Sequence, residues 1–183
     1  MRQIRHDLKN KLIGIYGIED DNELIRTKIK EIIGELEDSK KNLYTDNCIL
    51  NSVLNIKYSA AQVADIKIES NIFVPKYMNI DYGDMGVLFG NLLDNAIEAN
   101  QGVDRKKRWI NVSVKYEEHI LIINIKNSKI RGSRRKKKGY LNHGIGLNSV
   151  KQIVEKFNGI VEVQDFGEMY EVSAILYGFF DYR

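Results

Sequence analysis

Three short blocks of this sequence combine residue types that could serve as a nucleophile, as metal ligands and as an anion-binding turn. The first block, at 5–10, reads RHDLKN and places an imidazole beside a carboxylate. The second, at 91–99, reads NLLDNAIEA and carries several side-chain oxygens. The third, at 143–147, reads HGIGL and places two glycines directly before a helical pattern. Each block is a weak signal alone, but their order along one chain favours one interpretation over the others.

The first block contains a candidate nucleophile, His6. A neutral imidazole that attacks a phosphorus atom needs a carboxylate to hold its tautomer or take its proton, and Asp7 is adjacent. Asn10 lies one helical turn later on the same face, where it could orient water in the reverse, dephosphorylating reaction. A surface histidine that pairs with Asp7 and does nothing else is the alternative.

The second block predicts a stripe of oxygen ligands on a helix. Asn91, Asn95 and Glu98 stand at i, i+4 and i+7, so they share one face. The opposite face, which we expect in the core, carries Leu92, Leu93 and Ala96. Amide and carboxylate oxygens suit Mg²⁺, which usually takes substrate phosphates as further ligands. Such a stripe could therefore bind Mg²⁺; a solvent-facing polar stripe is the alternative.

The third block predicts a phosphate-binding turn. Gly144 and Gly146 allow close approach of the backbone to a ligand, and a helix expected from about Leu147 directs its free N–H groups there. A simple tight turn is the alternative. No Gly-Lys-Ser/Thr follows, which excludes a P-loop, and no strand directly precedes the glycines as a dinucleotide-binding fold would require.

The basic run 131–138 could close over an anion as a lid. No aromatic residues interleave with it, which argues against RNA binding.

Apolar spacing predicts the elements that position these blocks. Helices expected at 2–18 and 25–36 repeat apolar residues every three or four positions. Two such short helices are not stable alone, so we expect residues 1–40 to form a hairpin that dimerises into a four-helix bundle. Residues 38–47 are polar and predict a linker.

A second domain is expected over 45–183. The order of its elements is helix, strand, helix, two strands, helix, two strands, which predicts an α+β fold with helices on one face of a mixed sheet. The expected helices are 48–65, 83–99 and 147–157, and the expected strands are 66–69, 109–116, 120–127, 160–164 and 170–177.

Composition limits the class of protein. The chain has 183 residues, 43% hydrophobic and 29% charged, which suits one medium domain with a small appendage. A net charge of +3 is too small to indicate nucleic acid. The single cysteine, Cys48, excludes an internal disulfide, and its apolar neighbours predict a buried thiol. No stretch approaches the roughly 18 apolar residues of a membrane span. The abrupt start close to His6 suggests a fragment of a longer protein.

Taken together, the three blocks resemble those of sensor histidine kinases. Residues 5–10 resemble the H-box, residues 91–99 the N-box and residues 143–147 the second glycine box. The resemblance spans nearly the whole chain. It implies a GHKL-type α/β sandwich, the ATP-binding fold shared with gyrase, the MutL repair ATPase and a heat-shock chaperone. Within the family the likeness is strongest to peptide-pheromone receptors of the accessory-gene-regulator type, which act in quorum sensing.

The resemblance also implies roles for residues and partners. His6 would accept the γ-phosphoryl group of ATP with Asp7 as base, and pass it to an aspartate of a response-regulator receiver domain. The hairpin would form a homodimer in the cytoplasm, below an upstream sensor and transmembrane module of a bacterial plasma-membrane receptor. Mg²⁺ would lie at Asn95 and Asn91. The implied ATP contacts are Asn91, Asn95, Asn127, Lys138, His143, Gly144, Ile145, Gly146 and Leu147.

Two positions bear on the rival interpretations. Hydrolysing members of the superfamily place Glu where this chain has Asn91, which favours phosphoryl transfer over steady hydrolysis. Most histidine kinases carry an Asp-x-Gly-x-Gly segment where this chain has NSKI at 127–130, although the Asn127 amide oxygen can still accept from an adenine amine. The alternatives are a non-catalytic pseudokinase, a chaperone- or repair-type ATPase, and a serine kinase of the anti-sigma kind.

Overall fold

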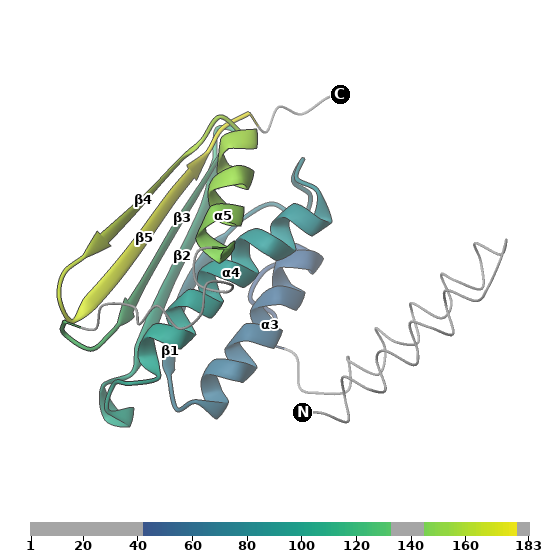
Figure 1. Cartoon of the computed structure of the whole chain (residues 1–183). Coiled ribbons are helices and arrows are strands. Elements are labelled where there is room, and N and C mark those ends of the chain that lie inside the picture. Colours follow the sequence, from purple (N-terminus) through teal and green to yellow (C-terminus); the bar gives the residue numbers. More distant parts are fainter. Residues whose placement is uncertain (1–41, 133–144, 179–183) are drawn as a thin grey trace, which may run out of the picture. The chain divides into compact units, whose positions relative to one another are not determined.

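A five-stranded mixed sheet with helices on one face is the framework of this protein (Figure 1). The computed structural model describes residues 42–132 and 145–178. The helical hairpin expected at 1–40 lies outside the described residues, as does the basic loop beyond residue 132. All described residues after Asn42 belong to one compact unit, which begins at Leu43.

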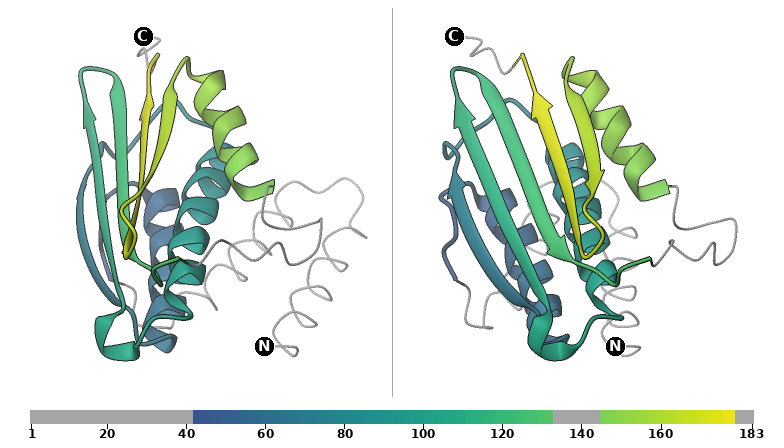
Figure 2. Two further views of the ribbon diagram at one scale, coloured as in Figure 1. Left: turned by 60° about the vertical axis from the view of Figure 1, so that its left-hand side comes forward. Right: turned by 90° about the vertical axis from the view of Figure 1, so that its left-hand side faces the viewer.

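The helices and strands, labelled in Figure 1, confirm the expected α+β class. The helices are α3 (Cys48–Val63), α4 (Tyr82–Asn100) and α5 (Ile145–Lys156), with a 3₁₀ turn η1 (Arg105–Lys107). The strands are β1 (Lys67–Phe73), β2 (Trp109–Glu117), β3 (Ile120–Ser128), β4 (Ile160–Asp165) and β5 (Met169–Leu176). Their order in the sheet is β1-β2-β3-β5-β4, with β1 parallel to β2 and the other pairs antiparallel. Within the described ranges, the three helices cover one face of the sheet and leave the other face without a helix (Figures 1 and 2).

The β2–β3 hairpin fixes which strand residues face the helices. Its two-residue turn, Glu118 and His119, has positive φ angles of 49° and 65°, the conformation that matches the twist of paired strands. In this register Val112 lies opposite Ile125 and Val114 opposite Ile123, and all four side chains are buried. The alternation sends the intervening residues to the helix-free face.

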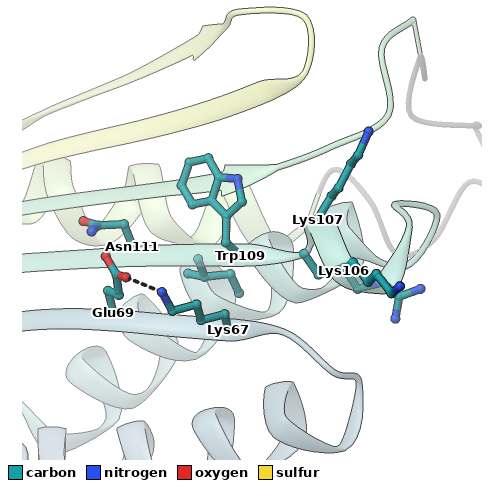
Figure 3. A pocket seen from close by; sticks show the side chains of 8 residues that line it. Lys67, Glu69, Lys106, Lys107, Trp109 and Asn111 are labelled. Carbon is teal, nitrogen blue, oxygen red and sulfur yellow. Dashed lines mark ion pairs between the residues drawn. The ribbon is translucent and has the colours of Figure 1, made fainter.

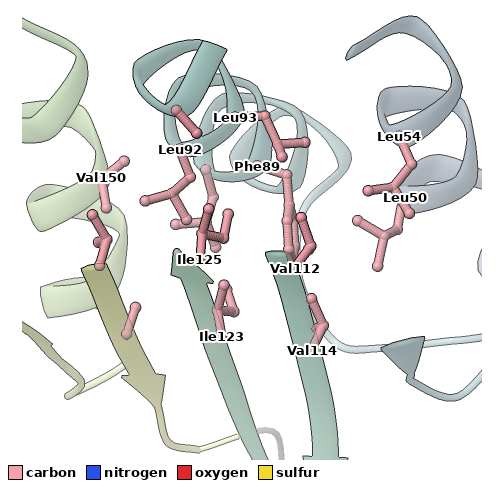
Figure 4. Packing of buried hydrophobic residues seen from close by; sticks show 14 of the residues in the cluster. Leu50, Leu54, Phe89, Leu92, Leu93, Val112, Val114, Ile123, Ile125 and Val150 are labelled. Atoms are coloured by element: carbon pink, nitrogen blue, oxygen red, sulfur yellow. The ribbon is translucent and has the colours of Figure 1, made fainter. Parts of the chain in front are cut away.

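The core lies between the helices and the sheet, and each helix contributes one apolar stripe to it (Figure 4). Fully buried side chains include Leu50 and Leu54 of α3, Leu88 and Phe89 of α4, and Val150 of α5. Burial of each large apolar side chain contributes about 1.5–3 kcal/mol, so this layer carries most of the stability.

Polar side chains cap two of these helices. The Asn47 carboxamide oxygen accepts from Leu50 N at 3.0 Å, and its nitrogen donates to Lys76 O at 3.1 Å, which ties the start of α3 to the loop after β1. Asp81 accepts from Gly83 N at 2.7 Å at the start of α4. None of the helices in the described ranges is both long and apolar enough to cross a bilayer.

Three details of the sequence prediction were wrong. Cys48 is exposed, because it stands in the first turn of α3 on the side away from the core face of Leu50 and Leu54. β1 runs on to Phe73, because parallel pairing with β2 satisfies a backbone whose Glu-Ser-Asn composition predicts no strand. α5 begins at Ile145, two residues earlier than expected, so the second glycine of the third block is helical.

The connection between α5 and β4 depends on Gly159. Asn158 adopts the left-handed conformation, with φ 50°, two residues after the last helical residue, Lys156. Gly159 is needed for space instead: a Cβ atom there would lie 2.2 Å from Ile175 O and 2.9 Å from Val154 Cγ1. The end of α5 is thereby held directly against β5.

We expect Gly159→Ala to destabilise the protein by about 1–3 kcal/mol, because the methyl group forces a backbone carbonyl and α5 apart. Urea denaturation measures this change. The matched control is Gly86→Ala in α4, where a Cβ meets nothing within 4 Å and the helix gains propensity. Equal stability of the two variants would show that the α5–β5 contact is not tight.

Candidate functional site

The polar stripe of α4 is present as the sequence predicts. Asn91 and Asn95 are half-buried and Glu98 is exposed, whereas the opposite face of the helix is buried. Leu92, Leu93 and Ala96 on that face are no more than 2% exposed. Packing of this buried face fixes the rotation of α4 about its axis. The Asn91 and Asn95 side chains therefore remain half-buried at the edge of the core.

The start of α5 lies against this stripe. A Cβ atom on Gly146 would stand 3.2 Å from Asn91 Oδ1 and 3.5 Å from its Cγ. The second and third blocks of the sequence, about fifty residues apart, therefore meet in space. The first N–H groups of a helix have no partner within it and carry partial positive charge, so the Asn91 amide stands beside an anion-attracting helix end.

An ion pair sets the other end of the α4–α5 contact. Lys156, in the last turn of α5, pairs with Asp84 in the first turn of α4, and the Asp84 carboxylate raises the pKa of the Lys156 ammonium. Since Asp84 meets the end of α5 and Asn91 meets its start, the two helices run antiparallel. Two contacts at opposite ends fix where the N-terminus of α5 lies.

Asp94, one of the two carboxylates in the segment 91–99, is committed elsewhere. Lys57 of α3 contacts both of its oxygens, at 2.7 and 2.6 Å. The pair holds α3 to α4 and neutralises the carboxylate. Asp94 is therefore not a spare anionic ligand for a metal ion.

The remaining oxygen atoms of the stripe determine which metal it could bind. Asn91 and Asn95 offer neutral amide oxygens, and the part of the chain that the structure describes holds no group of three His, Cys, Asp or Glu side chains suited to a metal. A neutral pair of ligands does not balance a divalent cation, but the phosphates of a nucleotide do. The residues fit Mg²⁺ that binds together with a phosphate ligand and not a metal held by protein alone.

Asn127 lies at the end of β3 on the helix-covered face and is only 2% exposed. Its amide nitrogen donates to Ser128 O at 3.0 Å. This bond does not use the acceptor oxygen, the atom on which the expected adenine contact depends.

A buried polar network that the sequence analysis missed joins α4 to the sheet. Asn100, fully buried at the end of α4, accepts from Trp109 N at 3.2 Å and donates to Trp109 O at 3.3 Å. The Ser128 hydroxyl donates to Asn100 Oδ1 at 2.5 Å. The signal was available: Asn100 follows Ala96 by four positions and so is a polar residue on the apolar face.

Two of the other predicted site residues lie at the start of α5. Ile145 opens α5, and Leu147 is half-buried in its first turn. Those outside the described residues are His6, Asp7, Asn10, Lys138, His143 and Gly144.

Comparison with known proteins agrees with this geometry. The family model described as the GHKL domain matches residues 80–176, more than half of the chain and the segment that holds α4, α5 and the sheet from β2 onward. This chain belongs to the GHKL domain family.

Individual relatives come from sensor kinases. The chain is 32% identical over 95 residues to the "Probable C4-dicarboxylate sensor kinase" of Bacillus subtilis (strain 168), covering 46% of this chain but 18% of that protein's length. The fold of this chain is similar to that of the catalytic domain of histidine kinase ThkA. The TM-score is 0.56 at 15% identity, over 71% of this chain and 90% of the ThkA domain. The mycobacterial sensor histidine kinase MprB gives a TM-score of 0.53 at 20% identity, over 70% and 92% of the two chains. Identities this low show a shared fold alone.

We expect Gly146→Ala to weaken ATP binding about tenfold while leaving stability unchanged or slightly raised. The new methyl group displaces the Asn91 amide, whereas alanine favours the helix. Calorimetric titration with ATP and urea denaturation separate the two effects. Gly86→Ala in α4 serves as the control and should leave the affinity for ATP as it is. If Gly146→Ala binds ATP with unchanged affinity, the contact between position 146 and Asn91 is not part of the ATP-binding site.

Proposed function

We propose that this chain is the catalytic portion of a sensor histidine kinase, in which residues 45–183 bind ATP and residues 1–40 carry the phospho-acceptor. The observation that carries the proposal is the contact of Gly146 with Asn91, which places a helix N-terminus beside an amide stripe in a GHKL domain. The sequence relationship to a sensor kinase supports it.

In this proposal the described residues bind and orient the nucleotide. Asn91 and Asn95 would hold Mg²⁺, which when bound neutralises phosphate charge. The first N–H groups of α5 would face the phosphates, and the Asn127 amide oxygen would accept from the adenine amine. Lys138, His143 and Gly144 would complete the phosphate contacts.

The reaction we propose is transfer of the γ-phosphoryl group to His6. An N–P bond forms at the imidazole, the bond between the γ-phosphorus and the bridging oxygen breaks, and ADP leaves. Asp7 takes the imidazole proton, and Asn10 orients water in the reverse, dephosphorylating direction. The phosphoryl group then passes to a response-regulator aspartate. An Asn at position 91, where ATPases of the superfamily carry Glu, disfavours steady hydrolysis.

The assembly belongs to the same proposal. Residues 1–40 would form the homodimer, and the chain would be the cytoplasmic part of a bacterial membrane receptor with an upstream sensor module. Pheromone receptors of the accessory-gene-regulator type remain the subfamily that we propose, on the H-box and N-box residues.

Loss of Asn95 should remove magnesium-dependent nucleotide binding. We expect Asn95→Ala to weaken Mg²⁺–ATP binding by at least about 10–100-fold, because one direct metal ligand is lost. Calorimetric titration with and without Mg²⁺ measures the effect. Asn71→Ala, at an exposed position of β1, is the matched control. Nucleotide affinity that stays the same in Asn95→Ala would contradict the metal assignment.

Loss of His6 should abolish labelling but not binding. With γ-labelled ATP we expect an acid-labile, base-stable label on the wild-type chain and none on His6→Gln, since the nucleophile is gone. Asp7→Asn should slow labelling by about 100- to 10,000-fold. His119→Asn, in the β2–β3 turn, is the histidine control and should label normally.

The labelling experiment also separates the rival functions. Acid-stable label that persists in His6→Gln would indicate a hydroxyl acceptor, as in a serine kinase. ATP bound without any label in a confirmed dimer would indicate a pseudokinase. Steady release of phosphate without label would indicate an ATPase.

A further inference from the structure

A pocket of about 360 Å³ opens on the helix-free face of the sheet, where β1 and β2 begin (Figure 3). Its side chains include Lys67, Glu69, Lys106, Lys107, Trp109 and Asn111. Trp109 and Asn111 alternate along β2 with Ile110 and Val112, which are buried under the helices. The pocket therefore faces away from the amide stripe of α4 and is separate from the proposed nucleotide site.

The loop that carries two of these lysines is held rigidly. Asp104 caps η1 by accepting from Lys106 N at 2.9 Å. The Arg108 guanidinium donates to three backbone carbonyls, those of Ala64 at 2.7 Å, Val103 at 2.8 Å and Gln101 at 3.1 Å. Arg108 is thus a structural clamp, and the backbone at Lys106 and Lys107 is fixed before any ligand arrives. Such preorganisation lowers the entropy cost of binding.

The charge of the pocket is unbalanced. Lys67 pairs with Glu69 at 2.8 Å, and this partner lowers the pKa of the Glu69 carboxyl. The pair is neutral in sum, which leaves Lys106, Lys107 and Arg108 as excess positive charge, and both lysines are exposed. Beside them Trp109 is half-buried and presents a large aromatic surface. An aromatic anchor next to a polar, charged rim is the composition of a protein–protein contact.

We propose that this pocket docks an acidic peptide segment of a partner protein. One apolar side chain of the peptide packs on Trp109, and neighbouring carboxylates pair with Lys106 and Lys107. Small-molecule sites are lined mainly by apolar side chains, whereas five of the eight residues that line this pocket are charged, which favours a peptide. β1 is an edge strand, so among the residues that the structure describes no further strand of the sheet flanks the pocket on that side.

Trp109 itself provides the readout, because it is the only tryptophan of the chain. The full-length chain is titrated without nucleotide with a synthetic Asp-Glu-Leu-Glu-Glu peptide, and in parallel with Asn-Gln-Leu-Gln-Gln, while tryptophan emission is followed. We expect a saturable change with the acidic peptide alone. Because the titration contains no ATP, its result stands whether or not the kinase proposal holds.

Variants test the pairing. The double variant Lys106→Gln, Lys107→Gln should weaken peptide binding about tenfold, because two ion pairs are lost. The control Lys76→Gln, Lys151→Gln removes the same charge from exposed positions elsewhere and should change binding less than about twofold. Both should bind ATP as the unmodified chain does.

Three results would overturn the proposal: an equal response to the neutral peptide, an emission that stays constant, or equal affinity in the two double variants. Emission that changes with protein concentration instead of peptide concentration would assign the pocket to a second copy of this chain, and would also overturn it.

Discussion

The close approach of α5 to α4 at Gly146 is the constraint on which the site depends. A Cβ at that position would stand 3.2 Å from Asn91 Oδ1, so even a methyl group would push the amide aside, and the helix N-terminus and the amide are neighbours by close packing. That packing requires α5 to be fixed elsewhere. The Lys156–Asp84 pair and the tight passage at Gly159 fix its far end, and the buried Val150 fixes its middle.

The same helices show how charge is arranged around the stripe. Asp84 and Asp94 are both on α4, and each is paired with a lysine of a neighbouring helix. The faces that remain beside α5 carry neutral amides. A cation held by neutral ligands near a helix N-terminus is stabilised only when an anion accompanies it, because the helix end itself carries partial positive charge. Metal and phosphate are therefore expected to bind as one unit at such a site.

Periodicity predicted the parts of the fold that depend on one face of one element. The stripe of α4, the β2–β3 hairpin and the α+β class all follow from spacing within short segments, and the structure confirms them. The sequence prediction is wrong or incomplete where a contact with a residue distant in sequence determines the local structure. β1 extends because β2 offers a ladder, and Asn100 is buried because Trp109 and Ser128 satisfy it. The role of Gly159 likewise depends on a distant residue, because a Cβ there would lie against Ile175 O.

A buried side chain links the helix of the amide stripe to the strand that carries Trp109. Asn100 ends the helix that carries Asn91 and Asn95, and it binds both backbone groups of Trp109, whose ring stands in the pocket on the other face. Communication between two sites needs an element with two discrete arrangements that both sites bias. The bonds of Asn100 define a single arrangement, since breaking them would leave a buried amide unsatisfied at a cost of about 1–3 kcal/mol. The network therefore acts as a fixed tie that positions both surfaces, and a peptide on one face and a nucleotide on the other are expected to bind independently.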